Sequence, residues 1–336
     1  MDSILPTPPV SASSTAPLLE FIESGPHEKG FAAHFKAKIA PLLEGVESNR
    51  LVQLASFKKR LAIAIPISIL IVAGGVYLEA TVGSDEAAFI KMAVALIAFV
   101  IFWAYVPIKR YKQDVKSKFM PVICEFFGNM TYGLTGTSTV ESLYRDEIFP
   151  SFTSSQMEDF IEGTYQQVKV KIHESTLKRK NGKHGSHTVF SGFVLELEFP
   201  KDFHGKTIML KDGGTLGNFF TGKDFKGLAC VELEDPEFEG MFQVFSSDQV
   251  EARFVLTTAF MERLLSLARL RSPNGTPNVQ CVFENKTLVI SVPCKQNLFE
   301  PGSIRKSALQ VDDLHVFLEQ MRDVFQLVDV LKLKRT

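Results

Sequence analysis

Two long apolar runs lie close together in the first third of this chain, and they constrain its fold more than any other feature. Residues 61–78 contain no charged side chain, and residues 87–108 contain only Lys91. A helix needs about 20 mainly apolar residues to cross the hydrocarbon core of a bilayer. Core helices of a soluble protein are the alternative, but two such runs with asymmetric flanking charges are hard to obtain that way. We therefore predict a transmembrane helical hairpin over residues 61–108.

The charges around the two runs predict the orientation of this hairpin. Residues 79–86, between the runs, contain three acids and no Lys or Arg. Cytoplasmic flanks of membrane helices are enriched in Lys and Arg. Both termini are therefore expected in the cytoplasm, because the basic residues that flank the runs stand on their outer sides: Arg50, Lys58, Lys59 and Arg60 before the first run, and Lys109, Arg110, Lys112, Lys116 and Lys118 after the second.

Lys91 is the one charge inside the two apolar runs. A lysine near a helix end can extend its ammonium group to the headgroups, where Asp85 or Glu86 is within reach. The alternative is an ion pathway, but a lone lysine without a second intramembrane charge is a poor conduction route. The first reading is preferred.

The segment before the hairpin has two parts. Residues 1–17 are rich in Pro, Ser and Thr, without a basic region followed by an apolar one. We expect a disordered tail there and no cleaved signal peptide. In residues 18–60 apolar side chains recur every three or four positions, which predicts an amphipathic helical segment. Proline inside a helix removes a hydrogen bond, so this segment is expected to bend near Pro41.

Residues 109–163, after the hairpin, are predicted to be a helical linker. The apolar pattern continues to about residue 127, and three glycines within residues 128–139 then interrupt it. Ser155 and Glu158 have the spacing of a capping box, which predicts a short helix that ends near Gly163.

Residues 164–336 are predicted to form a cytosolic domain. Apolar and polar residues alternate over 168–173 and 193–199, as in half-buried strands, and lysines on one polar face and glutamates on the other could form cross-strand ion pairs. Further strands fit 205–211, 229–234 and 241–245, and residues 279–292 fit a β-hairpin. Helices with one apolar face follow around residues 260–268 and 314–331. The predicted fold class is α+β: a two-helix transmembrane hairpin plus a cytosolic mixed β-sheet domain with packed helices.

Composition narrows the function. The formal net charge is −1, which gives no reason to expect nucleic acid, because such binding needs a clustered basic face. The four cysteines form no C-x-x-C pair and predict reduced thiols rather than disulfides. The sequence contains no P-loop, dinucleotide-binding, zinc-protease, serine-hydrolase or kinase motif. We accordingly assign no catalytic, cofactor-binding or metal-binding residue and expect no cofactor.

Two polar segments are the remaining candidates for a site. Residues 232–239 contain five acids, which suit either a divalent cation or, more simply, a solvated strand end. In residues 246–253, Asp248 has the character of a turn or cap residue. Glu251 and Arg253 are two positions apart and would share one face of a strand. These three residues are predicted to hold a strand-to-helix junction, with a ligand site as the alternative.

Several strings resemble a bacterial membrane-protein family known only as domain of unknown function thirty-one thirty-seven. The resemblance covers most of the chain from about residue 28 onward and implies a bacterial inner-membrane protein, with no established activity, cofactor or catalytic residue. Phe254 and Thr258 stand where the family pattern has Tyr and Pro. The strings that carry it are Phe190–Gly192, Leu233–Phe238, Phe245–Arg253, Leu256–Thr257 and Met261–Leu264.

We therefore expect a multi-pass protein of the bacterial inner membrane whose cytosolic part is a binding or scaffold module. The lack of a catalytic motif favours a protein that is not an enzyme, without deciding the question. The partners expected are the lipid bilayer and an unidentified protein or lipid, with oligomerisation left open and no nucleic acid. One alternative is a membrane-tethered enzyme that uses residues 232–253. Another is a small transporter or channel subunit with Lys91 facing a lumen.

Overall fold

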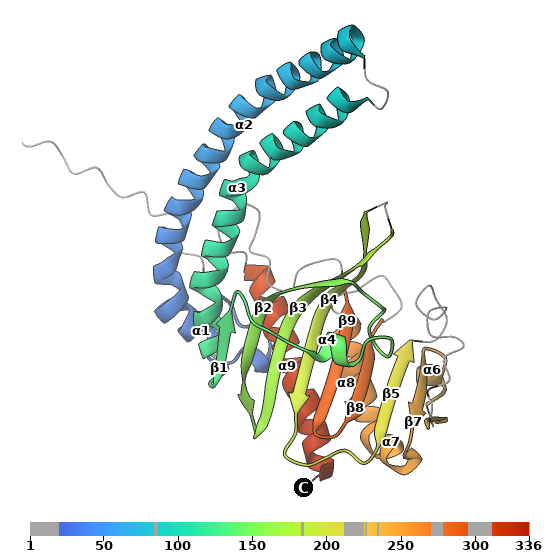
Figure 1. Ribbon diagram of the computed structural model, residues 1–336. Coiled ribbons are helices and arrows are strands. Elements are labelled where there is room, and N and C mark those ends of the chain that lie inside the picture. The colour runs from blue at the N-terminus through green and yellow to red at the C-terminus, as the bar shows by residue number, and fades with distance from the viewer. Residues whose placement is uncertain are drawn as a thin grey trace, which may run out of the picture.

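The computed structural model describes residues 20–83, 87–182, 185–211, 225, 227–233, 235–269, 278–294 and 311–335. Two long helices rise side by side from a nine-stranded sheet, and further helices cover the sheet (Figure 1). The α+β class predicted from the sequence is confirmed. The tail expected at residues 1–17 lies outside the described residues, as do Asp85 and Glu86, the expected neighbours of Lys91.

The amino-terminal helices join the apolar runs without a break. Short helical turns, η1 (Pro26–Glu28), α1 (Phe31–His34) and the π-helical η2 (Phe35–Ile39), lead into α2 (Ala40–Val82). The π-helical turn ends two residues before Pro41. Proline has no N–H to donate to the preceding turn, so the helix is irregular at the place where the sequence predicted a bend. Helix α3 (Ala88–Glu125) returns antiparallel to α2. At 1.5 Å per residue the two helices are about 65 Å and about 57 Å long.

All pairings between named strands are antiparallel. The sequence predicted a mixed sheet, and the structure differs from that prediction in strand direction. The strand order is β1-β2-β3-β4-β9-β8-β5-β7-β6. The strands are β1 (Met130–Gly133), β2 (Ser154–Tyr165), β3 (Val168–Lys180), β4 (Ser186–Glu198), β5 (Lys206–Lys211), β6 (Ala229–Cys230), β7 (Phe242–Ser246), β8 (Gln280–Glu284) and β9 (Thr287–Pro293).

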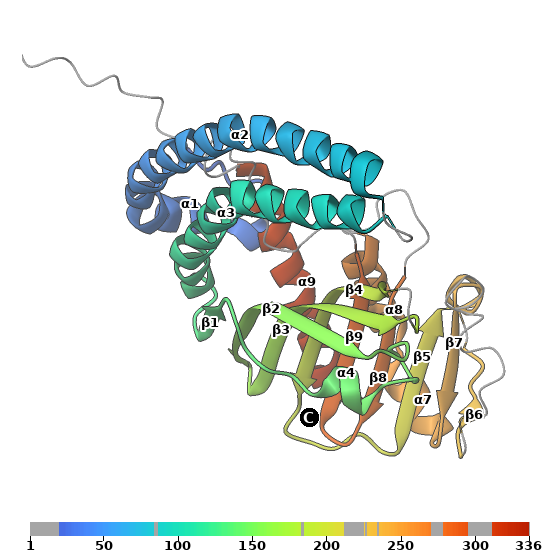
Figure 2. The same ribbon diagram turned by 45° about the horizontal axis from the view of Figure 1, so that its top comes forward.

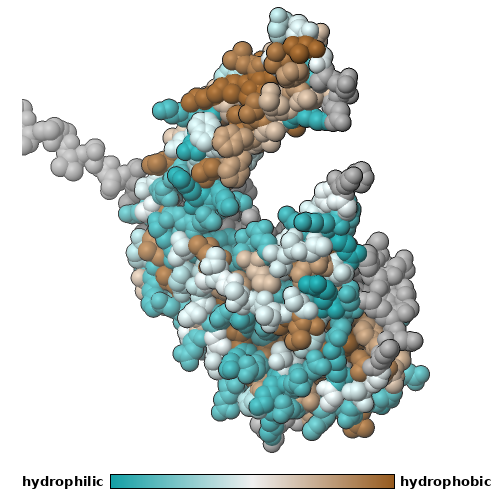
Figure 3. Space-filling model, in the orientation of Figure 1, coloured by the Kyte–Doolittle hydropathy of each residue, from teal (hydrophilic) through white to brown (hydrophobic). Residues whose placement is uncertain are grey.

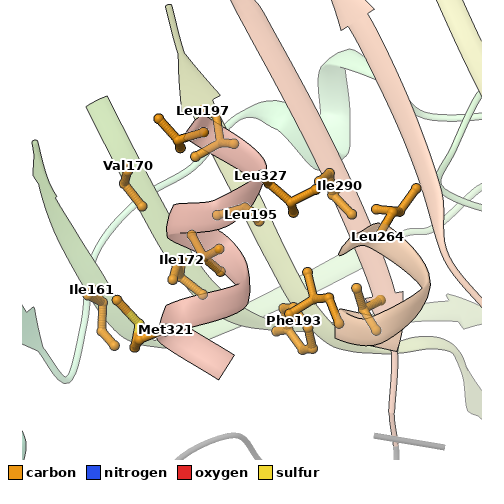
Figure 4. Packing of buried hydrophobic residues seen from close by; sticks show 14 of the residues in the cluster. Ile161, Val170, Ile172, Phe193, Leu195, Leu197, Leu264, Ile290, Met321 and Leu327 are labelled. Atoms are coloured by element: carbon orange, nitrogen blue, oxygen red, sulfur yellow. The ribbon is translucent and has the colours of Figure 1, made fainter. Parts of the chain in front are cut away.

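One sheet face carries the main core. Helix α9 (Val311–Arg335) lies across β2, β3, β4 and β9, beside α8 (Thr258–Arg269), and Figure 4 shows Met321 and Leu327 of α9 over these strands. Helix α7 (Gln249–Val255) packs on the same side, and α6 (Pro236–Glu239) stands beside β7. The stripe predicted for the last helix is buried, apart from half-buried Phe325.

The opposite sheet face is only partly covered. Helix α4 (Val140–Leu143) and the chain that follows it bring Tyr144, Ile148 and Phe149 over β3, β4 and β9, and these residues form a second apolar cluster. As a result the middle of β3 is buried on both faces, whereas the end near residue 169 keeps one face in water.

The main core extends across the expected boundary at residue 164, which falls inside β2. Phe31, Phe35 and Ile39 from the amino-terminal turns belong to the same cluster as the sheet and α9, as do Tyr111 and Phe119 from the lower half of α3. The base of the two long helices is therefore part of the folded domain.

The short helix expected from Ser155 and Glu158 is wrong, because both residues lie in β2. A cap contributes about 0.5–2 kcal/mol, whereas ten residues of this segment pair with β3 and Phe160 and Ile161 become buried. Pairing across the sheet outweighs the local signal. Strand β6 is also shorter than the predicted 229–234, while β5, β7 and the β8–β9 hairpin match their predicted positions.

The shared core predicts that a change near the amino terminus destabilises the whole domain. Ile39 is completely buried, so Ile39→Ala should lower the free energy of unfolding by about 2–5 kcal/mol. Ile22, which is 77% exposed, gives the matched control, and Ile22→Ala should leave stability unchanged. Urea unfolding of the detergent-solubilised chain, followed by circular dichroism, measures both. Equal midpoints for the parent and Ile39→Ala would contradict a shared core.

Candidate functional site

Asp248 begins helix α7 directly after strand β7. Its Oδ1 accepts hydrogen bonds from the backbone N–H of Val250 at 2.9 Å and of Glu251 at 3.0 Å. The backbone of Asp248 is extended and its own N–H donates to Ser246 Oγ at 3.0 Å. The carboxylate thus satisfies amides that the first turn of the helix leaves without partners, as an N-cap does.

Glu251 and Arg253 do not share a face. Both lie in α7, where positions two apart point about 200° around the axis from each other, so the strand assumed from the sequence is wrong. Glu251 is nearly buried and lines an open hollow of about 630 Å³ with Lys201, Asp202 and His204. Arg253 lines a different hollow, of about 520 Å³, with Leu233, Asp235 and Met261. The three predicted residues are therefore divided between a cap and two separate hollows.

Two carboxylates of the acidic segment 232–239 accept hydrogen bonds from backbone amides of the same segment. Glu239 Oε1 accepts the N–H of Leu233 at 2.7 Å, and Asp235 Oδ1 accepts the N–H of Phe238 at 3.2 Å. Glu234 lies outside the described residues. Among the residues that the structure describes, no three His, Cys, Asp or Glu side chains are grouped to hold a metal ion.

Sequence reasoning missed a buried polar group under α4, the His173 cluster, which consists of Glu141, His173 and Glu196. His173 Nε2 lies 2.7 Å from Glu141 Oε1, and His173 Nδ1 lies 3.8 Å from Glu196 Oε1. Glu141 and His173 are fully buried. The ring of Phe160 stacks on the imidazole at a centroid distance of 5.0 Å. His173 continues the polar side of β3, which the alternating sequence pattern shows. Glu141 could not be predicted as its partner, because α4 has only four residues and so gives no helical pattern in the sequence.

The electrostatics of this cluster favour an ionised Glu141. Burial alone would raise the pKa of its carboxyl group, but the hydrogen bond and charge of His173, together with hydrogen bonds from the Glu141 backbone and the Ser175 side chain, hold that pKa below its ordinary value. An ionised carboxylate only accepts hydrogen bonds, so Nε2 of His173 carries the hydrogen. Ser138 Oγ donates to Glu196 at 2.6 Å rather than to the imidazole, so this serine is not positioned as a nucleophile activated by His173.

A second buried ionic group joins α3 to the sheet. Lys116 Nζ and Tyr132 Oη each contact one carboxylate oxygen of Asp159, which is 1% exposed. Asp159 sits at the bulge in β2 with φ of 56°, a conformation that turns its carboxylate out of the strand alternation. Burial and the Asp159 contact both raise the pKa of Tyr132.

A third polar contact joins the amino-terminal segment to α9. Glu28 is fully buried, and its Oε1 lies 2.5 Å from His315 Nδ1, while its Oε2 accepts the N–H of Ser24 at 2.5 Å. Phe21 stacks on the His315 ring at 4.3 Å. Burial would raise the pKa of Glu28, but the hydrogen bonds from Ser24 and His315 lower it overall.

The upper part of the long helices is an exposed apolar surface. We call residues 61–82 of α2 and 88–105 of α3 the apolar hairpin. Both helices are long and apolar enough to cross a membrane, and only 6% and 11% of their most apolar windows are buried. Figure 3 shows hydrophobic residues gathered at this end and hydrophilic residues over the sheet domain. The helices touch at Gly75, where an added Cβ would lie 2.9 Å from Ala93 Cβ.

Aromatic and basic side chains meet at the lower end of the apolar hairpin. The Arg60 guanidinium lies 4.9 Å from the centre of the Trp103 ring, and its Nη1 donates to the Trp103 carbonyl at 2.9 Å. Phe57 packs edge-on against Tyr105 at 5.6 Å. Four exposed basic residues stand near the same level of the two helices: Lys58, Lys59, Lys109 and Arg110.

The fold and these groups define an α+β protein with an exposed apolar helical hairpin. A family model described as protein of unknown function (DUF3137) matches residues 188–333, which confirms the resemblance seen in the sequence. The matched segment runs from β4 into α9. The crystal structure of the mycobacterial trehalose monomycolate transport factor A, TtfA, is similar with a TM-score of 0.37 and 12% identity, over 66% of this chain and 95% of that chain. No curated protein matches the sequence.

The capping geometry predicts the effect of Asp248→Ala. Loss of the two amide contacts should lower the free energy of unfolding by about 0.5–2 kcal/mol, because the first turn of α7 then lacks its acceptor. Glu262→Ala removes an exposed carboxylate from the neighbouring helix α8 and should cost much less. Thermal melts of the two variants make the comparison. If both melted alike, Asp248 would not be holding this junction.

The His173 cluster predicts a dependence of stability on pH. Because folding lowers the pKa of Glu141, its contribution is fully present above the ordinary value of 4.5 and is lost as the pH falls through the lower folded value. Glu141→Gln should therefore be less stable at neutral pH and lose less stability between pH 5 and acid. Glu198→Gln, at an exposed pair, should keep the parent's acid response. Urea midpoints across this pH range test it, and parallel curves for Glu141→Gln and the parent would refute the assignment.

Proposed function

We propose that this chain is a membrane-anchored module of the bacterial inner membrane. In this proposal the apolar hairpin crosses the bilayer, both termini lie in the cytoplasm, and the sheet domain binds a protein, lipid or small ligand close to the membrane. The exposed apolar hairpin is the observation that carries the proposal. Large apolar side chains such as Leu70, Phe99 and Phe102 are 64–71% exposed there. Contiguous apolar surface of this extent needs an apolar partner, and lipid surrounds a helix pair on all sides.

The charge pattern supports the orientation. Basic residues stand at the lower end of the apolar hairpin, and Arg60 with Trp103 and Tyr105 gives the mixture of cation and aromatic rings found at membrane surfaces. In the segment at the other end, residues 79–86, all three charged residues are acidic. Under the positive-inside rule, the sheet domain would then lie on the cytoplasmic side together with both termini.

The base of the long helices supports an anchor that holds the domain rather than a loose tether. Lys116 with Asp159 and Glu28 with His315 join the helical base to β2 and α9, and Asn49 donates to Asp114 between α2 and α3 at 2.8 Å. A partner bound to the sheet would thus be kept at a set distance from the bilayer.

The sheet offers a surface for such a partner. An open hollow of about 470 Å³ lies over β1 to β4 and β9, on the sheet face opposite α9, and we call it the polar hollow. Lys169 pairs with Glu198 at 3.0 Å, and Lys171 with Glu162 at 3.5 Å. Glu196 of the His173 cluster also lines it. Paired charges of both signs suit a polar partner of low net charge.

Cysteine labelling in spheroplasts tests the proposed anchoring. Val82, 66% exposed at the end of α2, and Ser117, exposed on the lower half of α3, are changed singly to Cys. Cys230 and Cys294 are replaced by Ser in this background. Cys124 and Cys281 remain, because they are buried and burial raises the pKa of both thiols, that of Cys124 to about 12.

An impermeant maleimide should label Val82→Cys in intact spheroplasts and Ser117→Cys only after lysis. The background without an added cysteine is the control and should remain unlabelled in both states. Labelling of Ser117→Cys before lysis would reverse the proposed topology. Equal labelling at both sites in intact spheroplasts would rule out a hairpin that spans the bilayer.

A further inference from the structure

Strands β3 and β4 extend beyond the rest of the sheet. Strand β9 pairs with β4 no further than Gly192, and β2 pairs with β3 no further than Lys178. Beyond these points β3 and β4 pair only with each other, through Arg179 with His187 and Lys180 with Ser186. We call the described residues of this projection, 178–182 and 185–188, the basic prong.

The basic prong points the same way as the apolar hairpin. Figure 1 shows the prong rising from the sheet toward the side on which α2 and α3 rise. After the rotation in Figure 2, the prong and the hairpin still run in similar directions from the domain. The turn between β8 and β9, around Lys286, lies at the opposite end of the strands, because Glu198 of β4 pairs with Thr287 there.

The charge of the prong is all of one sign. Residues 175–195 contain no Asp or Glu, while Lys178, Arg179 and Lys180 follow one another in β3. Lys180 and His187 are exposed. Within the described part of the chain, no carboxylate forms an ion pair with Lys178 or Lys180, in contrast to Lys169 and Lys171 lower in the same strand.

The base of the prong is held in place. Arg179 Nε donates to the carbonyl of Ser151 at 2.7 Å, and the N–H of Lys180 donates to Thr153 Oγ1 at 3.1 Å. The N–H of Thr153 donates to the carbonyl of Lys178 at 2.8 Å. The segment before β2 therefore supports β3 where it leaves the sheet, so that the lysines are presented in a defined direction.

We propose that the basic prong binds the anionic headgroups of the bilayer in which the apolar hairpin is anchored. This inference rests on the proposed function, because the hairpin places the membrane on the side to which the prong points. Anionic lipids in the cytoplasmic leaflet attract basic segments that lie near the surface. A lipid surface fits better than nucleic acid, since the positive charge is confined to one projecting tip. With the hairpin and the prong both in contact, the sheet domain is fixed in tilt as well as in distance from the bilayer.

A fluorescent label at Ser186→Cys tests this contact in the full chain. Ser186 is exposed and uncharged, and Cys230 and Cys294 are replaced by Ser as above. An environment-sensitive dye is attached, and the protein is reconstituted into nanodiscs of phosphatidylcholine, alone or with one third phosphatidylglycerol. The emission should shift to shorter wavelength in the anionic nanodiscs only. Lys178→Gln combined with Lys180→Gln should remove more than half of that shift, and high salt should reduce it.

Two controls separate this inference from the proposed anchoring. Lys286→Gln removes one positive charge from the opposite end of the strands and should leave the shift unchanged. A label at Val94→Cys, 62% exposed on the apolar hairpin, should report lipid in both kinds of nanodisc. Circular dichroism melts confirm that the variants fold.

An emission from Ser186→Cys that is identical in the two lipids would overturn the headgroup contact, and anchoring would stand if Val94→Cys still reported lipid. A shift that survives the double glutamine variant would also overturn it, because the lysines would not carry the contact. If Val94→Cys reported water in both nanodiscs, the anchoring and the prong contact would fall together.

Discussion

Helices α2 and α3 each run without a break from an exposed apolar end to a base that is buried in the core of the sheet domain. Backbone hydrogen bonds continue along both helices through the two environments except at Pro66, Pro107 and Pro121, which have no N–H, so the helices constrain the direction of the apolar end relative to the core. Phe57 and Tyr105 mark the change on the two helices, and below them Tyr111 and Phe119 are in the main core. The position of the sheet relative to the apolar hairpin follows from this continuity.

Buried polar contacts make the joint between helices and sheet specific. Apolar packing tolerates alternative arrangements of similar volume, whereas an unpaired buried charge is costly, by about 3–5 kcal/mol when one partner of a buried pair is removed. Lys116 with Asp159 and Glu28 with His315 each join segments far apart in the sequence. A shift of α3 along β2, or of the amino-terminal turns along α9, would leave these charges without partners. The arrangement is thereby selected over others that bury the same apolar area.

Sequence patterns predicted the elements with long, regular periodicity. The two apolar runs, the apolar stripe of α9 and the β8–β9 hairpin lie where the sequence predicted them. Lys169 also pairs with Glu198, as the alternating charges of β3 and β4 suggested. Predictions from short local sequence signals were wrong more often. The capping box at Ser155 lies in a strand, and Glu251 and Arg253 lie on a helix that the sequence pattern treated as strand. A few residues of local preference contribute less than the pairing and burial that a sheet provides.

The residues of the candidate site also fall into those that the sequence could predict and those that it could not. Asp248 could be identified as a cap because the interaction is local, between a side chain and amides two and three residues later. The His173 cluster could not, since Glu141, His173 and Glu196 come from a four-residue helix and two strands and meet only when α4 folds over the sheet. The direction of the basic prong depends likewise on which neighbouring strands end before β3 and β4 do.

By itself the sequence determined which segments are apolar, which alternate and where basic residues gather, because these properties are set by residue type and spacing along one strand or helix. Only the tertiary structure decided that the amino-terminal turns, α3 and α9 share one core, and which buried charges meet. The contact between Glu28 and His315, for example, joins residues 287 positions apart. Their partners are chosen by packing over the whole domain rather than by any local pattern.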